Sequence, residues 1–197
     1  MSKGQLTREH IVVKAATLFN TRGYAGSSMN DLMSVTGLKK GGIYNHFNNK
    51  EEILLEAFDY AFEQVNQAVT AVIKSHYTAT DKLKAVIQFY RDYALSPVIE
   101  GGCPIINATV EADDTNAQLK EKVQMAVQLL IAGLSRVISR GIRRGEFRAD
   151  LDVERVAVMF IAQIEGAVIL ARSCQDQKYM DMVSDQLLAY IDRELIV

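Results

Sequence analysis

The chain has 197 residues, of which 49% are hydrophobic and 23% charged, and its formal net charge is only −2. This balance excludes long disordered stretches, which combine few apolar residues with a high net charge. No stretch approaches about 20 uninterrupted apolar residues, so no membrane span is expected, and the N-terminus is too polar for a secretory signal. We therefore expect a soluble, cytoplasmic protein with one or two small domains.

The charge is divided unevenly along the chain. Residues 1–50 hold seven basic and two acidic residues, a net charge of +5, whereas residues 51–197 have a net charge of −7. Such an asymmetry favours a polyanion as the partner of the first quarter. Chance variation on an ordinary surface explains the charge alone equally well, so other features have to decide.

Proline is nearly absent and no segment alternates with period two, so the chain is predicted to be all-α, with about nine helices. Glycines mark the breaks, and Gly23 and Gly37 are expected to end the first two helices. N-caps are expected from Thr7, Ser27 or Ser28, Asn49 with Glu52, Thr115 with Gln118, and Asp152. The expected helices span about 7–22, 28–35, 39–46, 49–75, 81–95, 104–112, 115–144, 153–174 and 179–195.

Two short helices joined by the turn at Gly37 are typical of a helix-turn-helix. In this motif the second helix, here residues 39–46, lies in the major groove of DNA and presents its outward side chains to base edges. The first and fourth helices would hold the pair in place. The apolar framework of the motif would be Leu32, Leu38, Ile43 and Phe47.

Lysines and glycines open this expected recognition helix. Lys39 and Lys40 are predicted to meet phosphates, both through their charge and with help from the helix N-terminus. Gly41 and Gly42 leave the backbone free of side-chain bulk where it would approach the duplex. Lys50, at the start of the following helix, is predicted to add a further phosphate contact.

Polar side chains complete the predicted DNA contacts. Tyr44 is expected to reach a phosphate through its hydroxyl, and Asn45 and His46 are candidates for base-edge contacts, since asparagine pairs bidentately with adenine. Ser27 and Ser28 could donate hydrogen bonds from their hydroxyls to phosphates of the DNA backbone. Each residue also has a structural alternative: Tyr44 as a half-buried aromatic, Asn45 as a plain surface residue, and His46 as the C-terminal cap of a short helix.

The segment 7–55 resembles the TetR family of bacterial transcriptional regulators. The matching pieces are IVVKAATLFNTRGYAGSSMNDL and VTGLKKGGIYNHFNNKEEIL, and the pattern G-L-x-K-G-x-I-Y-x-H-F-x-x-K-E-E-I-L is quite specific for the family. The resemblance implies a homodimer that binds a palindromic operator in double-stranded DNA and releases it when a small-molecule effector binds. Repression is the family's usual mode. We therefore expect a DNA-binding domain at residues 1–50 and a ligand-binding and dimerisation domain at residues 51–197.

Two departures from the family pattern have structural consequences. Met33 stands where a small residue is usual, and Gly42 is expected to yield the space that Met33 takes. Lys39 replaces the usual serine, so the recognition helix lacks a side-chain N-cap worth about 0.5–2 kcal/mol. We expect this helix to be loose in the free protein and ordered by phosphates.

A pocket for the effector is predicted in the C-terminal three quarters, where aromatic and soft side chains gather, although such residues also suit a plain hydrophobic core. Glu165 interrupts an apolar helix and needs a partner there, either an effector or an arginine of a second subunit such as Arg172. Cys103 precedes Pro104 at a helix start, where a thiol can become reactive; a buried filler is the alternative. The predicted pocket comprises Phe58, Phe62, Phe89, Tyr93, Cys103, Met125, Met159, Phe160 and Glu165.

The segment VAVMFIAQIEGAVILA is apolar on nearly all sides, so it either packs in the core or contacts a second subunit. The last helix offers a second apolar stripe, and the two would form a four-helix dimer interface, as the family resemblance implies. Two-fold symmetry is also what a palindromic operator requires. The predicted interface comprises Ala162, Gly166, Ala167, Leu187, Leu188 and Ile191.

Other classes of function fit less well. The three histidines show no metal-ligand spacing, and the chain has no nucleophile motif, phosphate loop or dinucleotide fingerprint. Neither an enzyme nor a cofactor or metal is therefore predicted. A helical protein-interaction module would fit the acidic part but leaves the basic segment and its motif unexplained.

Overall fold

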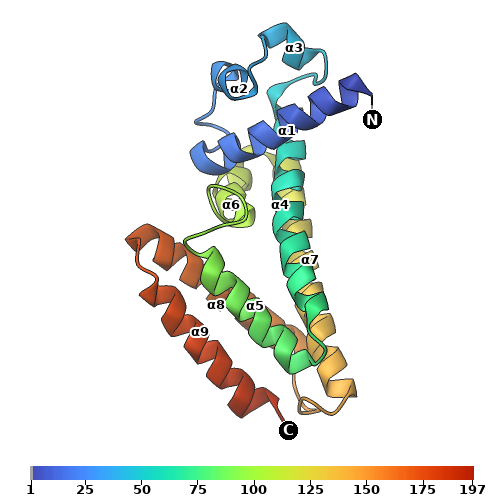
Figure 1. Ribbon diagram of the computed structural model, residues 1–197, viewed down its shortest axis with the longest axis vertical. Helices are drawn as coiled ribbons and strands as arrows, with labels where there is room; N and C mark the ends of the chain where they lie inside the picture. Colours follow the sequence, from blue (N-terminus) through green and yellow to red (C-terminus); the bar gives the residue numbers. More distant parts are fainter. Residues whose placement is uncertain (1) are drawn as a thin grey trace. The chain divides into compact units, whose positions relative to one another are not determined.

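The computed structural model describes residues 2–197, without the side chains of residues 113–115. Throughout these residues the secondary structure is helical and no strand forms, which confirms the all-α prediction (Figure 1). A π-helical turn, Ile191–Leu195, follows the last helix. The helices are α1 (Lys3–Arg22), α2 (Met29–Thr36), α3 (Lys40–Tyr44), α4 (Lys50–Ser75), α5 (Ala79–Tyr93), α6 (Pro104–Thr115), α7 (Ala117–Arg143), α8 (Val153–Cys174) and α9 (Lys178–Tyr190).

The first helix begins four residues earlier than predicted. Its N-cap is Ser2, whose hydroxyl accepts from the backbone of Gln5 while the Gln5 side chain accepts from the backbone of Ser2. This reciprocal capping box satisfies two N–H groups that the start of a helix leaves open. The hydroxyl of Thr7, the predicted cap, instead donates to the carbonyl of Lys3. Gly23 ends the helix with φ of +75°, as predicted.

Three predicted N-caps are confirmed. Ser28 caps α2, Asn49 Oδ1 accepts from the backbone N–H of Glu52 at 2.7 Å, and Asp152 caps α8. The Glu52 carboxylate reaches back to the N–H of Asn48 and not to that of Asn49, so the predicted box is closed one residue earlier.

The start of α7 differs from its prediction. The predicted cap, Thr115, has a side chain outside the described residues. Asn116 takes the capping role, because its Oδ1 accepts from the backbone N–H of Leu119 at 2.9 Å.

The chain forms two compact units. The first comprises Met1–Asn66 with Val98–Ala126, and the second comprises Gln67–Pro97 with Val127–Val197. Helices α4 and α7 contribute residues to both. Helix α6 packs against α1 and so joins the N-terminal helices, although it comes much later in the chain.

In the first unit, α1 buries an apolar face, and the helix-turn-helix packs against this helix. Helix α1 contacts α2, and α2 contacts α3. Leu32, Ile43 and Phe47 are almost fully buried and Leu38 is half-buried, as the sequence predicted for the framework. The buried side chains of α1 are Ile11, Val12, Ala15, Ala16, Leu18 and Phe19.

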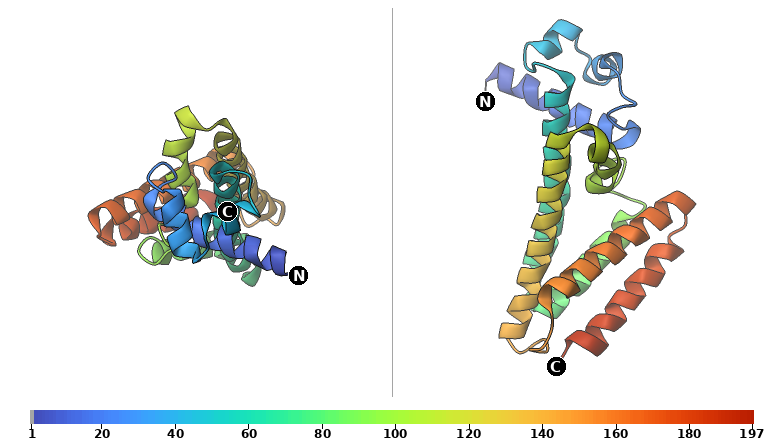
Figure 2. Two further views of the ribbon diagram at one scale, coloured as in Figure 1. Left: turned by 90° about the horizontal axis from the view of Figure 1, so that it is seen from above. Right: turned by 180° about the vertical axis from the view of Figure 1, so that it is seen from behind.

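In the second unit, α8 and α9 run side by side and α5 packs against both (Figure 2). Phe160 and Ile164 point into the core of this unit, whereas Val158, Ile169 and Leu170 remain exposed on α8. Helix α8 is therefore apolar on a buried face and on an exposed face, and the exposed face is left without a partner in the single chain.

Of the described helices, α7 and α8 are each long and apolar enough to cross a membrane by length and composition. Charged and polar residues interrupt both helices. Core helices of a soluble protein have the same properties, and the described part of α8 buries seven residues within its own unit.

Candidate nucleic-acid interface

The tight turn between α2 and α3 fixes the direction of the short third helix. Gly37 adopts the left-handed conformation with φ of +70°, which a glycine reaches without strain. The hydroxyl of Thr36 donates to the carbonyl of Leu32 at 2.6 Å and so closes the last turn of α2. The N-cap of α3 is Lys39, which makes no side-chain capping bond, as predicted.

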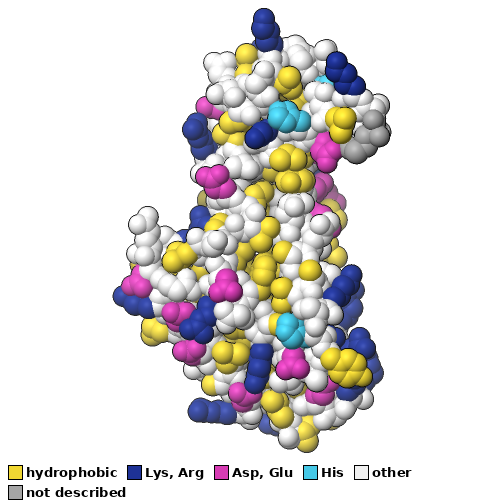
Figure 3. Space-filling view, viewed as in Figure 1, with side chains coloured by type: hydrophobic (Ala, Val, Ile, Leu, Met, Phe, Trp, Pro, Cys, Tyr) yellow, Lys and Arg dark blue, Asp and Glu magenta, His cyan; other side chains and the backbone are white. Residues whose placement is uncertain are grey.

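The outward face of α3 is basic and accessible. Lys39, Lys40, Tyr44 and Asn45 are exposed, and His46 is half-buried. The ammonium of Lys40 lies 5.9 Å from the ring centroid of Tyr44, so the two side chains stand on the same side of the helix. Lys and Arg side chains project from the end of this unit that α2 and α3 form (Figure 3).

Gly41 and Gly42 occupy different surroundings. A Cβ added at Gly41 would meet no atom within 4 Å, so the backbone there is open to an approaching molecule. A Cβ added at Gly42 would meet Leu38 at 3.7 Å and nothing of Met33. The expectation that Gly42 yields its space to Met33 was therefore wrong, because the side chain next to this position is that of Leu38.

Two predicted phosphate ligands are engaged within the protein. Ser27 is only 3% exposed and its hydroxyl donates to the carbonyl of Gly23 at 2.6 Å. Lys50 donates to the carbonyl of Tyr24 at 2.6 Å and lies 3.9 Å above the ring centroid of that tyrosine. Burial lowers the pKa of the Lys50 ammonium. Both residues stabilise the turn between α1 and α2. The contact of Lys50 joins residues 26 positions apart, and spacing along the sequence does not reveal it.

Ser28 is exposed but its hydroxyl is also occupied. It donates to the carboxylate of Asp31 at 2.5 Å while accepting from the backbone N–H of the same residue. These bonds, led by the one from the hydroxyl, hold the pKa of the Asp31 carboxyl below its usual range. In the free protein the hydroxyl of Ser28 is thus used to cap the N-terminus of α2.

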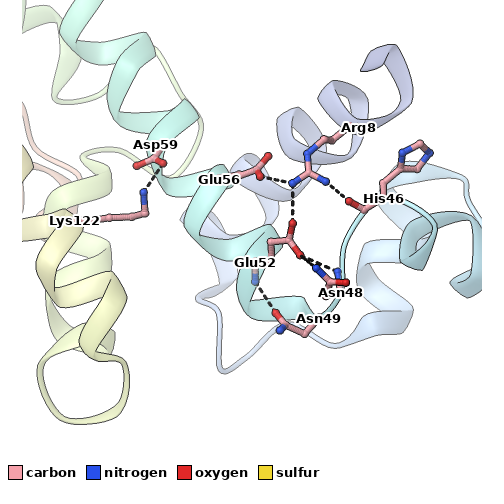
Figure 4. A network of polar contacts seen from close by, with 8 residues as sticks. All are labelled: Arg8, His46, Asn48, Asn49, Glu52, Glu56, Asp59 and Lys122. Atoms are coloured by element: carbon pink, nitrogen blue, oxygen red, sulfur yellow. Dashed lines mark hydrogen bonds and ion pairs between the residues drawn. The ribbon is translucent and has the colours of Figure 1, made fainter. Parts of the chain in front are cut away.

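An arginine that the sequence analysis did not single out joins α1 to the end of the motif. Arg8 pairs with Glu52 at 2.8 Å and with Glu56, and it donates to the carbonyl of His46 (Figure 4). Its guanidinium also stacks 4.0 Å from the ring centroid of Phe47. The only signal in the sequence is the spacing of the two glutamates, which puts them on one face of α4.

The charges of this cluster shift one another's pKa. The bonds to Glu56 and then Glu52 raise the pKa of Arg8. The bond from Arg8 is the main cause that lowers the pKa of Glu52, and the N–H of Asn48 adds to it. Arg8 and Glu52 are therefore both ionised at neutral pH, and their ion pair connects the end of α3 to the start of α4.

Helix α6 closes the other end of α1. The Glu111 carboxylate accepts from the backbone N–H groups of Tyr24 at 2.7 Å and Ala25 at 3.1 Å. Asn107 donates to the carbonyl and to the side chain of Asn20, each at 3.0 Å. The turn that leads into α2 is thus held by side chains that follow it by more than eighty residues.

The residues of the predicted effector pocket are divided between the two units. In the first, Phe58 and Phe62 stack with ring centroids 6.4 Å apart, Cys103 is buried at the start of α6, and Met125 is 49% exposed. Phe58 also lines a cavity of about 30 Å³, which is room for a water molecule and not for an effector.

In the second unit, Phe89 and Tyr93 lie with ring centroids 5.8 Å apart. Phe160 is fully buried and packs edge-on against Tyr190. Met159 and Glu165 are half-buried on α8. The aromatic residues thus form part of this unit's core, and the effector pocket stays a prediction.

The six residues of the predicted dimer interface separate into two sets. Ala167, Leu187 and Ile191 are buried within the chain's own second unit, so they support the surface from beneath. Ala162 is exposed and Gly166 is half-exposed, and a Cβ added at Gly166 would meet nothing within 4 Å. Leu188 is half-buried. The apolar surface open to a partner also includes Val158, Ile169, Leu170 and Met182, which lie on the two helices expected to form the interface.

Among the described residues, no group of three or more His, Cys, Asp or Glu side chains is arranged to hold a metal ion. The feature that stands out is a short basic helix with an open backbone, held on a buried frame by α1, α2 and α4. These features define a helix-turn-helix DNA-binding protein.

Comparison with known proteins identifies the family. Residues 11–57 match the model of bacterial regulatory proteins of the tetR family, and residues 79–187 match that of the tetracyclin repressor-like C-terminal domain. An uncharacterized HTH-type transcriptional regulator of Mycobacterium tuberculosis is 33% identical over 95% of both chains.

Solved structures agree with this assignment. A TetR transcriptional regulator from Chloroflexus aurantiacus is 41% identical, with a TM-score of 0.96 and complete coverage of both chains. One from Cytophaga hutchinsonii is 36% identical, with a TM-score of 0.92 over 100% of this chain and 98% of that one. The chain therefore belongs to the TetR family and is a DNA-binding transcriptional regulator.

Proposed function

We propose that this regulator binds a palindromic operator as a homodimer, represses transcription, and leaves the operator when a small molecule binds to its C-terminal part. On this proposal residues 1–50 contact DNA, and residues 51–197 bind the effector and form the dimer. The protein acts in the cytoplasm and catalyses no reaction. Its family membership and the exposed basic face of α3 support the assignment.

The observation that carries the proposal is the accessibility of α3. Lys39 and Lys40 have no carboxylate bound to them among the described residues, so their charges are available for phosphates. Asn45 lies exposed on the last turn, where an amide can pair with an adenine edge. The open backbone at Gly41 lets the helix approach the floor of a groove.

Homodimerisation is supported by the exposed apolar face of α8. Val158, Ala162, Gly166 and Ile169 follow one another at helical spacing and leave an apolar stripe in contact with water. A contiguous exposed apolar surface of this kind is typical of an interaction site. A two-fold axis through this face would present two copies of α3, as two half-sites of a palindrome require.

Selection of bound sites from random duplex DNA, repeated at several salt concentrations, tests the proposal. We expect a palindromic consensus and an affinity that falls steeply with salt. Lys40→Ala should weaken binding to all sites and reduce the salt slope by about 1, whereas Asn45→Ala should relax the choice at one position of each half-site. Arg193→Ala, which removes an exposed cation of the second unit, is the matched control.

The result that counts against the proposal is a monomeric protein that binds no duplex at low salt. A consensus without two-fold symmetry would contradict the homodimer alone. Addition of candidate small molecules to the bound complex then tests release.

A further inference from the structure

A groove lined by five basic side chains lies within the second unit, where the C-terminal ends of α4 and α7 meet the first turns of α5. Its volume is about 580 Å³, within the range of roughly 300–1,000 Å³ for small-molecule sites. Basic side chains are visible at this end of α4 and α7 in Figure 3. The five cations are Lys74 of α4, Lys82 of α5, and Arg136, Arg140 and Arg143 of α7.

The groove contains positive charge without negative charge. None of its lining residues is acidic, and within the described residues the structure records no carboxylate bound to any of the five cations. The carboxylate of Glu146 touches Ala79 at the edge of the groove, but it accepts the N–H groups that open α5 and pairs with Arg144 at 3.8 Å. An anion therefore has no internal competitor for these side chains.

The concentration of charge does not follow from composition. The second unit holds 13 basic and 12 acidic residues, so it is close to neutral. Arg136, Arg140 and Arg143 nevertheless follow at intervals of four and three, which puts all three on one face of α7. Like charges at this spacing repel one another, and a bound polyanion would relieve that repulsion.

The remaining lining suits the rest of such a ligand. Thr70, Ser135 and Ser139 supply hydroxyls that donate to phosphate or accept from a sugar. Ile73 and Val137 supply an apolar surface between the charged side chains. A site of this composition can hold both a phosphate chain and a less polar group.

We propose that this groove binds a small molecule with two or more phosphate groups, of the nucleoside polyphosphate class. A single phosphate would leave most of the five cations uncompensated, whereas a di- or triphosphate would compensate most of them. Arginine forks bind phosphate oxygens bidentately, so the two arginines one turn apart would hold adjacent phosphates. The site shares no residue with the proposed operator contacts or with the predicted effector pocket, and it stands without either.

Titration calorimetry on the full-length protein at low salt tests this, with adenosine triphosphate, pyrophosphate and inorganic phosphate as probes. We expect one triphosphate per chain, bound more tightly than pyrophosphate, which in turn binds more tightly than phosphate. Arg136→Gln combined with Arg140→Gln should weaken triphosphate binding at least about tenfold, since each removes a charge-assisted bond. Arg193→Gln should leave it unchanged.

Because DNA is also a polyanion, operator binding separates the two surfaces. Lys40→Ala should bind triphosphate as well as the parent protein does, and the Arg136 and Arg140 double variant should keep its operator affinity. A double variant that loses operator affinity tenfold while melting normally would instead make the groove a contact for nucleic acid. Triphosphate binding that survives the double variant, disappears in Lys40→Ala, or equals that of inorganic phosphate overturns the proposal.

Discussion

The guanidinium of Arg8 and the carboxylate of Glu52 form an ion pair at 2.8 Å, although they lie 44 positions apart in the sequence. The pair lies where the chain leaves α3, because the same guanidinium donates to the carbonyl of His46. The end of the proposed recognition helix is thereby held on α1 and on the first turn of α4.

Replacing Arg8 should raise the pKa of Glu52. The bond from Arg8 is the main cause that lowers the pKa of Glu52. In Arg8→Met this pKa should therefore rise most of the way to the ordinary glutamate value. Because the pKa of Glu52 is lower in the folded state, the ionised carboxylate stabilises the fold at pH values above the ordinary glutamate pKa. This contribution to folding stability is lost as the pH falls through the folded-state pKa. Carboxyl titration by NMR measures this directly. An unchanged Glu52 pKa in the variant would show that Asn48 alone is responsible.

Lys50→Met should reduce stability and leave the electrostatics of DNA binding intact. The ammonium is bound to the carbonyl and ring of Tyr24, so its loss should cost about 1–2 kcal/mol of folding free energy. Denaturant unfolding gives this value. The salt slope of operator binding should stay at the parent value, in contrast to that of Lys40→Ala. A salt slope of operator binding that falls by about 1 in Lys50→Met would show instead that Lys50 binds a phosphate.

Glu111→Ala should loosen the turn between α1 and α2. Its carboxylate accepts the N–H groups of Tyr24 and Ala25, and losing these acceptors should cost about 1–3 kcal/mol. Glu111→Gln keeps one acceptor oxygen and serves as the matched variant, with a smaller loss. Hydrogen exchange of those two amides should accelerate in the alanine variant. Equal exchange in the parent and in both variants would contradict this role.

Two glycine-to-alanine substitutions should have opposite effects on folding. Gly101 has φ of +98° and faces Asn20 so closely that a Cβ has no room, so Gly101→Ala should destabilise the protein by more than about 1 kcal/mol. Gly41 is helical and open, so Gly41→Ala should be neutral or stabilise by up to about 1 kcal/mol. The methyl group added in Gly41→Ala should nevertheless weaken operator binding, because it fills the open backbone surface that would approach the DNA. Thermal unfolding and operator affinity, measured on both variants, check this pair.

Ala162→Glu should convert a homodimer to a monomer. The new carboxylate would lie on the exposed apolar stripe of α8 and would be desolvated in an interface. Sedimentation analysis should show the change in mass, and operator affinity should fall with it. Ala71→Glu, at another exposed alanine on α4, should leave both unchanged. A dimer that tolerates the charge at position 162 would place the interface elsewhere.

The local elements of this protein followed closely from its sequence. Ser28, Asn49 and Asp152 cap the helices that they were expected to cap, and Gly23 and Gly37 end the helices before them. These features depend on residues three or four positions apart, so a sequence contains them completely. The apolar framework at Leu32, Ile43 and Phe47 follows in the same way from helical spacing.

Contacts between distant segments were decided only by the tertiary structure. Lys50 has the residue type of a phosphate ligand, yet folding places the backbone carbonyl of Tyr24 within reach of its ammonium. Arg8 and Glu111 became important in the same way, because each binds partners from distant parts of the chain. Likewise, Leu187 was apolar at the expected spacing, but only packing shows that it faces inward. The sequence determines which bonds a side chain can form, and the fold determines which possible partner lies within bonding distance.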